Sequence, residues 1–302
     1  MHPLTEPLQP VSSLDATLSV ARSIGWGAVR ILRSYYRGEP HPDGSERPLE
    51  IRHQPGGPVT AADLAVNHYV LSQLKAVFGT EAFGYLSEET DKVSPITQPL
   101  PYDWVWIIDP LDGTRDFIER TGDHAFHLAL VHHGRPVLAV VACPERDTLY
   151  YATRGGGTFR ETPAGLTQAV RVAQPHCLDE LTLIVSPMHR GTRLNRLLER
   201  LPSRKTLAVG SIGGKIVAIL ERRADVYISL SGQSAPKDWD MAAPELILTE
   251  AGGLFTHADG RSLQYNTGDV SQWGCIIASP ATCHWELCTE VQRLLAEIDR
   301  TS

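Results

Sequence analysis

Apolar residues recur three and four positions apart from Ser12 or Ser13 to about Tyr36, and this spacing predicts an amphipathic first helix. A second helix is predicted from residue 61 to about residue 78, with Thr60 as its N-cap. The polar stretch between them, residues 38–58, is typical of a mobile loop or of a β-turn region that covers a site. Short apolar runs bounded by turns then predict an antiparallel meander, with strands at residues 104–108, 125–131, 137–142, 148–152 and 157–160.

Beyond about Val172 the pattern changes to an alternation of strands and helices, which is typical of α/β structure. Strands are predicted at residues 181–185, 206–209, 225–228 and 274–278. Helices are predicted at residues 193–200, 212–222, 241–251 and 281–295. We therefore expect an α+β lobe, residues 1–172, and an α/β lobe, residues 173–302, that share one cleft.

Composition excludes several classes of protein. Apolar residues make up 42% of the 302 residues and charged residues 21%, so wholesale disorder is not expected. The formal charge of −7 and the absence of a basic block argue against binding to a nucleic acid polymer. No window approaches the roughly 20 apolar residues that span a bilayer, and the N-terminal ten residues do not resemble a signal peptide.

The five cysteines are odd in number and scattered through apolar or predicted helical segments, which does not suit a disulfide framework. We expect a reduced, cytoplasmic protein with buried thiols. Cys283, His284 and Cys288 could bind zinc, but no fourth ligand is near, so structural thiols are the preferred interpretation.

The most informative motif is the sequence DPLDGT at residues 109–114. A buried strand that ends at Asp109 delivers one carboxylate at its tip, and the turn that follows can bring Asp112 back to the same point. Two carboxylates and a backbone carbonyl are hard oxygen ligands, which suit magnesium, manganese or calcium better than zinc. Gly113 lets the backbone approach an anion closely, and Thr114 adds a hydroxyl and an amide. The motif alone is equally compatible with simple turn chemistry.

Further acids stand at the ends of predicted elements. Glu88 and Glu89 follow a short apolar run, and Asp240 stands at the head of the helix predicted at residues 241–251. Taken alone, Asp240 is more typical of an N-cap than of a ligand. Crowded carboxylates repel one another unless cations bind between them, and a cluster that holds two or three metal ions is suited to phosphate-ester hydrolysis.

Three motifs together resemble a known family: Ser87-Glu88-Glu89, WIIDPLDGT at residues 106–114, and Trp239-Asp240. They are similar to the lithium-sensitive, magnesium-dependent phosphomonoesterases, which include inositol monophosphatase, fructose-1,6-bisphosphatase and the 3'(2'),5'-bisphosphate nucleotidases. The resemblance extends from Pro58 to Gly253 and implies a layered αβαβα sandwich.

The resemblance also implies metal ligands. Glu88, Asp109 and the carbonyl of Leu111 would hold a first Mg²⁺ ion, and Asp109, Asp112 and Asp240 a second. Two or three ions are expected, with Mn²⁺ as a possible substitute.

Catalytic and substrate-binding roles follow from the same resemblance. Thr114, oriented by Asp63, would work with Glu88 to position and activate the attacking water. The amides of Gly113 and Thr114 would receive the phosphate, and Asp240 would also contact the substrate.

Within the family, residues 115–123 resemble the CysQ-type nucleotidases, which remove the 3'-phosphate from 3'-phosphoadenosine 5'-phosphate. Residues 186–189, which end in His189, and residues 210–215, which contain Ser211 and Lys215, are similar to substrate-binding segments of those enzymes.

Three departures affect the 5'-phosphate anchor. Pro187 stands where the related segment has arginine, Lys215 lies one residue further from Ser211, and Ser229 replaces an arginine found in many nucleotidases. Lys215, Lys237 or Arg115 could supply the cation.

We therefore expect a 3'(2'),5'-bisphosphate nucleotidase that acts on a small phosphate ester as a monomer or homodimer. The alternatives are an inositol-1-phosphate or fructose-1,6-bisphosphate phosphatase, and a relative that binds phosphorylated ligands without turnover. A nucleoside triphosphatase is disfavoured, because residues 210–215 have too few residues between the glycines for a phosphate loop.

Overall fold

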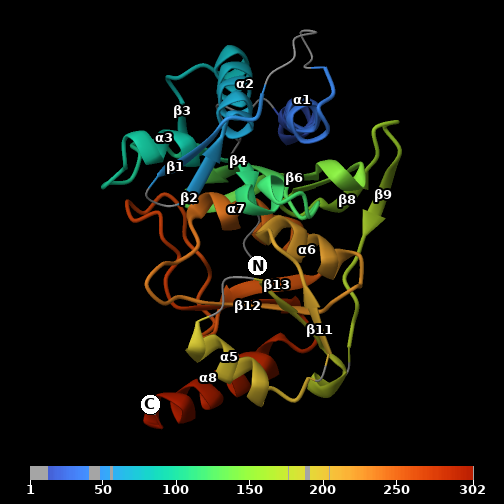
Figure 1. Ribbon diagram of the computed structural model, residues 1–302, viewed down its shortest axis with the longest axis vertical. Helices are drawn as coiled ribbons and strands as arrows, with labels where there is room; N and C mark the ends of the chain where they lie inside the picture. The colour runs from blue at the N-terminus through green and yellow to red at the C-terminus, as the bar shows by residue number, and fades with distance from the viewer. Residues whose placement is uncertain are drawn as a thin grey trace.

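Helices and two β-sheets alternate in five layers in the computed structural model of the chain (Figure 1). The structure describes residues 13–40, 48–54, 57–175, 177–187, 191–203 and 205–301. This arrangement agrees with the predicted αβαβα sandwich. Within the described residues, no helix combines the length and apolar character needed to cross a membrane.

The helices α1 (Leu14–Arg37) and α2 (Ala61–Phe78) cover the outer face of a seven-stranded sheet (Figure 1). The strands follow one another in chain order; the first pair is parallel and every later pair is antiparallel. They are β3 (Phe83–Ser87), β4 (Trp104–Asp112), β5 (Ala125–His132), β6 (Arg135–Cys143), β7 (Thr148–Thr153), β8 (Gly157–Glu161) and β9 (Thr167–Val170).

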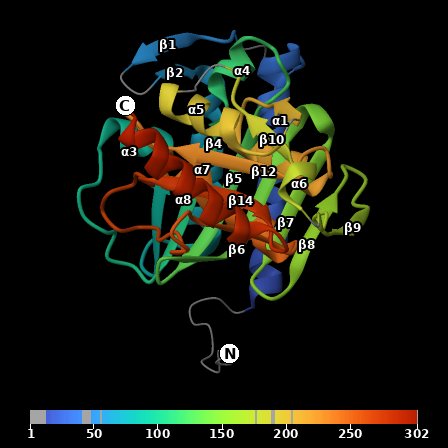
Figure 2. The same cartoon turned by 90° about the horizontal axis from the view of Figure 1, so that it is seen from below.

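The helices α6 (Ile212–Leu220) and α7 (Asp238–Glu250) lie between the two sheets, and α5 (Thr192–Arg200) and α8 (His284–Arg300) cover the far side of the second sheet (Figure 2). The second sheet is mixed, with β10 parallel to its two neighbours and β14 antiparallel to its own. In sheet order its strands are β11 (Lys205–Ala208), β10 (Thr182–Val185), β12 (Val226–Leu230), β14 (Cys275–Pro280) and β13 (Gly253–His257).

Shorter elements complete the fold. The antiparallel pair β1 (Ile51–Gln54) and β2 (Gly57–Thr60) precedes α2. The short helices α3 (Glu88–Val93) and α4 (Thr114–Ile118) follow β3 and β4 directly, and the two 3₁₀ turns are Pro144–Arg146 and Leu178–Glu180.

Strand β4 is buried at every position because helices pack on both faces of its sheet. Trp106 and Ile108 belong to the core under α1 and α2, whereas Val105 and Ile107 belong to the core that includes α6 and α7. Side chains in a strand alternate between faces, so a continuous apolar run is what such a position requires. A third buried cluster lies between the second sheet and the helices α5 and α8.

Most predicted elements are present, and the differences occur at their ends. Ser13 caps α1, and Thr60 caps α2 with the reciprocal hydrogen bonds of a capping box. The predicted strand 104–108 continues to Asp112, and the helix predicted from residue 241 begins at Asp238. The sequence analysis did not predict β9 and β13, nor the short elements β1, β2, β3, α3 and α4. Of the polar stretch 38–58, residues 41–47 and 55–56 lie outside the described residues.

The expectation of buried thiols holds for three of the five cysteines. Cys143, Cys283 and Cys288 are buried and Cys177 and Cys275 are half-buried, and each is free. Burial raises the pKa of Cys143 to about 12, which keeps this thiol protonated and inert.

Candidate active site

The DPLDGT motif occupies the junction between β4 and α4. The pairing of β4 with β5 shifts between Asp109 and Asp112, and the Leu111 amide donates to Asp109 Oδ1 at 3.0 Å. Gly113 has φ of 84°, and a Cβ there would lie 2.9 Å from the carbonyl oxygen of Asp123. Only glycine fits this turn without strain or a shift of the neighbouring backbone.

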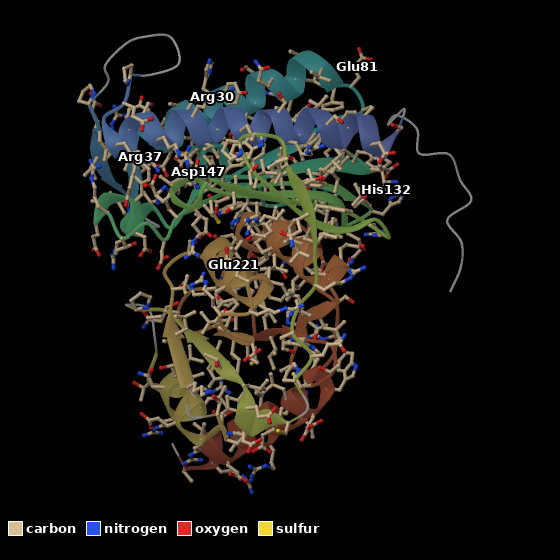
Figure 3. The ribbon with its side chains drawn as sticks, turned by 90° about the vertical axis from the view of Figure 1, so that its right-hand side faces the viewer. Arg30, Arg37, Glu81, His132, Asp147 and Glu221 are labelled. Atoms are coloured by element: carbon tan, nitrogen blue, oxygen red, sulfur yellow. The ribbon has the colours of Figure 1, made fainter. Side chains whose placement is uncertain are left out.

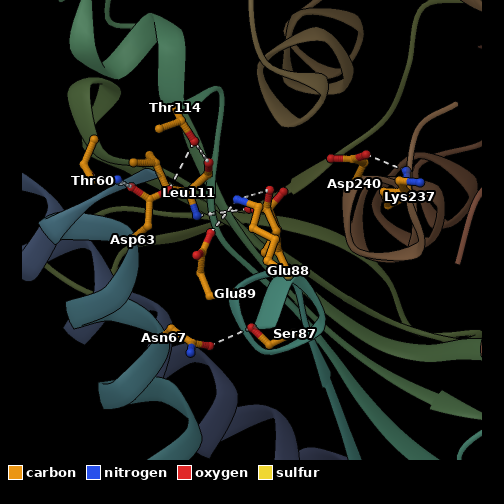
Figure 4. Close-up of polar contacts among 12 residues, drawn as sticks. Thr60, Asp63, Asn67, Ser87, Glu88, Glu89, Leu111, Thr114, Lys237 and Asp240 are labelled. Carbon is orange, nitrogen blue, oxygen red and sulfur yellow. Dashed lines mark hydrogen bonds and ion pairs between the residues drawn. The ribbon is translucent and has the colours of Figure 1, made fainter. Parts of the chain in front are cut away.

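Asp109, Asp112 and Asp240 form what we call the carboxylate cluster. One oxygen from each lies within 4.8 Å of the other two. Two of these acids come from the end of β4, and Asp240 comes from the first turn of α7. Asp240 Oδ2 also accepts the amide of Lys237 at 2.6 Å, so the residue caps its helix and faces the cluster at once (Figure 4).

Burial and like charge make the cluster costly to ionise. Burial, followed by the charges of Glu88 and Asp112, raises the pKa of Asp109 well above its usual value. Burial and the charge of Asp112 raise the pKa of Asp240 to about 7. Carboxylic acids in this state ionise readily only when a cation shares the site.

Glu88 is the first residue of α3, directly after β3, and its side chain lies beside Asp109. Lys92 Nζ lies 2.9 Å from Glu88 Oε1 and 2.7 Å from Glu89 Oε1. Burial raises the pKa of Glu88, and the ammonium group of Lys92 acts in the opposite direction.

Asp63 and Thr114 are joined by a hydrogen bond. Thr114 Oγ1 lies 3.1 Å from Asp63 Oδ1 and 3.2 Å from the Leu111 carbonyl oxygen (Figure 4). Asp63 Oδ2 also accepts the Thr60 amide at 2.7 Å and the Thr60 hydroxyl. Donation by Thr114 to Asp63 or Leu111 leaves the lone pairs of its oxygen free to accept a hydrogen bond from another group.

His127 is a site residue that the sequence analysis did not single out. It comes from β5 and is buried; its Nδ1 lies 3.2 Å from the Trp239 carbonyl oxygen and its Nε2 3.2 Å from Asp112 Oδ2. Burial alone would raise the pKa of Asp112, but His127 and the Gly213 amide, which donates at 2.6 Å, bring it below its usual value. A single histidine in the apolar run 125–131 was the signal that could have revealed it.

The N-terminus of α6 lies against the DPLDGT turn. Ser211 caps α6 by accepting the Gly214 amide at 2.8 Å, and its Cβ would be 3.0 Å from a Cβ at Gly113. Lys215 is buried and donates from Nζ to the Gly210 carbonyl oxygen. Burial lowers the pKa of Lys215, and the neighbouring carboxylates of Asp112 and Asp116 oppose that shift.

The two other candidates for contact with the substrate are His189 and Lys237. His189 lies outside the described residues, which resume at Gly191. Lys237 precedes α7, is half-buried, and donates from Nζ to Ser271 Oγ at 2.7 Å. Each lysine ammonium has three donors, so these single bonds leave further donors available.

The residues present fit Mg²⁺. The donor set consists of carboxylate oxygens with the Leu111 carbonyl oxygen close by, and hard oxygen ligands of this kind favour magnesium, manganese or calcium. Asp109 and Asp112 are buried and Asp240 is half-buried, and a bound cation would relieve the repulsion among these acids.

Comparison with known proteins agrees with this geometry. Residues 13–296 match the Inositol monophosphatase family. The 3'(2'),5'-bisphosphate nucleotidase CysQ of Salmonella typhimurium is 33% identical over 224 residues, 74% of this chain and 85% of that protein. The enzyme of the same name from Escherichia coli K12 is 28% identical over 252 residues, 83% of this chain and 93% of that protein.

Solved structures show the same fold. The inositol monophosphatase from Anabaena has a TM-score of 0.72 at 22% identity, covering 93% of this chain and 96% of that one. The suhB protein of Bartonella henselae has a TM-score of 0.71 at 23% identity, covering 93% and 98%. These structures confirm the predicted layered fold, and the match over residues 13–296 shows that the chain belongs to the inositol monophosphatase family.

Proposed function

We propose that this phosphatase hydrolyses a small phosphate monoester in a Mg²⁺-dependent reaction, and that its preferred substrate is 3'-phosphoadenosine 5'-phosphate. The observation that carries the reaction class is the carboxylate cluster beside the Asp63–Thr114 pair. The candidate metal ligands and the Thr114 hydroxyl thus meet around the turn between β4 and α4, with Asp63 contributed by α2 and Asp240 by α7.

The residues of the site divide the work. Glu88, Asp109 and the Leu111 carbonyl would hold one ion, and the carboxylate cluster a second. When bound, Mg²⁺ supplies a water of lowered pKa and neutralises charge on the leaving oxygen. Thr114, held by Asp63, would work with Glu88 to position the attacking water.

The phosphate would be received by backbone amides. The left-handed turn at Gly113 begins α4, and the amides of Gly113 and Thr114 are the candidates for contact with the phosphate oxygens. The Ser211 end of α6 lies against the same turn, so the C-terminal part of the chain can reach a substrate bound there.

The substrate proposal is supported by residues 115–123 and by the curated relatives, which are named bisphosphate nucleotidases. The proposed products are AMP and phosphate. Lys215 and Lys237 are the candidates for contact with the 5'-phosphate.

A substrate panel tests the proposal. Phosphate release is measured with 3'-phosphoadenosine 5'-phosphate, inositol 1-phosphate and fructose 1,6-bisphosphate, each with Mg²⁺ and with EDTA. We expect Mg²⁺-dependent turnover with the highest kcat/KM on the nucleotide. A faster reaction with another ester would reject the substrate while retaining the reaction class. Binding without turnover of any ester would favour a non-catalytic relative.

A further inference from the structure

A cavity of about 350 Å³ lies between the strands β8 and β9 and the C-terminal end of α6, apart from the candidate active site. We call it the arginine cavity, because Arg160, Arg171 and Arg222 line it. Figure 3 looks onto this side of the molecule and labels Glu221, which also lines the cavity. The nine-residue helix α6 spans roughly 13 Å, so the cavity is separated from the Ser211 end of that helix.

The guanidinium group of Arg160 has no hydrogen-bond or ion-pair partner in the part of the chain that the structure describes. It is half-buried in β8, where it stands opposite Tyr150 on one side and Gln168 on the other. Guanidinium groups that are partly removed from water are normally paired, because desolvation of an unpaired charge is costly.

The other two arginines bond only to uncharged groups among the described residues. Arg171 Nη1 donates to the Glu250 carbonyl oxygen at 2.5 Å, and Arg222 donates weakly to the Arg171 carbonyl oxygen at 3.4 Å. These carbonyl groups accept hydrogen bonds but do not neutralise the positive charges.

The acid in the wall of the cavity is already occupied. Glu221 lies 3.0 Å from Arg146 and 2.8 Å from Arg223, and it also accepts the Tyr150 hydroxyl at 3.1 Å. Arg223 and Arg146, which also lies 3.6 Å from Asp123, therefore already engage this carboxylate. The three arginines of the cavity have no carboxylate partner among the described residues. This local positive charge occurs in a chain whose formal charge is −7.

We propose that the arginine cavity binds a small anion that carries a phosphate or sulfate group. Planar guanidinium groups bind such oxyanions through paired N–H donors, and a cavity of this size is at the lower end of the range for small ligands. Its one aromatic ring, Tyr150, is bonded to Glu221, so the lining offers polar recognition and no free stacking platform. This site is independent of the phosphatase reaction proposed above.

Calorimetric titration with inorganic pyrophosphate tests the site. EDTA is present throughout, because without Mg²⁺ the active site lacks the cations that would hold a phosphate group there. The parent is compared with Arg160→Gln and Arg171→Gln at 0.15 M NaCl. Arg293→Gln is the matched control, since that arginine lies exposed on α8. Circular dichroism checks that each variant is folded.

We expect one molecule bound per chain, about tenfold or more weaker binding in Arg160→Gln and in Arg171→Gln, and no change in the control. The proposal would be overturned if the parent protein does not bind pyrophosphate at this salt concentration, or if the parent and Arg160→Gln bind it with equal affinity.

Two further measurements identify the place and the chemistry. Amide NMR signals of Gln168 and Ala169 should shift on titration while that of Gly113 does not, and the reverse pattern would overturn the assignment. Glycerol 3-phosphate and malonate are titrated alongside pyrophosphate. Weaker binding of malonate supports oxyanion recognition, and equal or tighter binding contradicts it. Tighter binding of glycerol 3-phosphate than of pyrophosphate indicates an organic ester as the ligand, and the reverse order indicates an inorganic anion.

Discussion

The carboxylate cluster and the two lysines beside it are held in opposite ways. Asp109, Asp112 and Asp240 face one another at close range although like charges repel. The ammonium groups of Lys215 and Lys237, by contrast, each bond to an acceptor near at hand, the Gly210 carbonyl and the Ser271 hydroxyl. The acids are therefore arranged for a partner from outside the chain, whereas the lysines are already hydrogen-bonded within it.

This contrast predicts which substitutions should reduce activity strongly and which should reduce it only slightly. Removal of one acid from the cluster changes a site that depends on the combined charge of its members, so the loss should extend to every substrate. Removal of a lysine changes one contact or one local turn, so the loss should be limited and should differ between substrates.

Asp109→Asn gives the largest expected effect. Asp109 is the acid proposed to contact both metal ions, so neutral asparagine weakens both sites together. We expect kcat/KM to fall by about a thousandfold or more, measured as Mg²⁺-dependent phosphate release. Asp103→Asn is the control, because that exposed acid precedes the same strand. Turnover within about tenfold of the parent would contradict the role of Asp109.

His127 makes two contacts, one with the Trp239 carbonyl and one with Asp112, and two substitutions can test them separately. In His127→Asn the amide nitrogen can replace Nδ1 and reach the Trp239 carbonyl, and in His127→Gln it can replace Nε2 and reach Asp112. Groups that hold a metal ligand typically contribute ten- to a hundredfold to metal affinity or activity. We expect a loss of about that size in His127→Asn and a smaller one in His127→Gln.

The measurements for this pair are kcat, KM and the Mg²⁺ concentration that gives half-maximal activity. A positioning role for His127 raises the Mg²⁺ requirement in the asparagine variant. If melting temperature falls equally in both variants while the Mg²⁺ requirement stays constant, His127 supports the fold and does not position Asp112.

The site differs in how far its parts could be predicted. Asp109, Asp112, Gly113 and Thr114 lie within six residues, and local turn chemistry and strand polarity are sufficient to bring them together. Asp240 is far from them in the chain, and its meeting with Asp112 was expected only because the motifs resemble a known family. The contact between His127 and Asp112 depends on the register of β4 with β5, which no local pattern specifies.

The fold shows the same division. Helices α1 and α2 were predicted nearly to the residue because caps and periodicity mark their ends. Strand β9 is exposed over most of its length and β13 is only five residues long, so neither has a strong apolar signal. The first turn of α7 was missed because its sequence, Asp238-Trp239-Asp240, does not follow the apolar pattern of a helix.

The lysines give a smaller, selective effect. Lys237 is half-buried and Lys215 fully buried, so Lys237 is the more accessible candidate for the 5'-phosphate. We expect Lys237→Ala to lower kcat/KM on 3'-phosphoadenosine 5'-phosphate roughly tenfold, with little change on adenosine 3'-monophosphate. Lys215→Met should lower both equally by disturbing the Gly210 turn. A loss confined to the bisphosphate in Lys215→Met would instead assign the anchor to Lys215.

The smallest expected effect is a pH-dependent stabilisation by Mg²⁺. Burial raises the pKa of Asp63 and of Asp240 to about 7, whereas an unfolded aspartate ionises near pH 4. Between these values the unfolded chain binds fewer protons than the folded one, so the stability of the metal-free protein falls as pH rises through this window. Bound Mg²⁺ offsets that loss by pairing with the ionised acids.

The melting temperature is measured with Mg²⁺ and with EDTA at pH 5.5 and at pH 8. The rise that Mg²⁺ produces should be larger at pH 8 than at pH 5.5 by at least about 2 °C. Burial also lowers the pKa of His124 to about 4, which reduces stability below pH 6.5, but this effect is common to both conditions and cancels in the difference. Asp240→Asn should reduce the dependence on pH, because one of the acids that must ionise is gone. An equal rise in melting temperature at both pH values would show that the carboxylate cluster does not exchange protons for metal. The acids would then not be arranged for a cation in the way that distinguishes them from the two lysines.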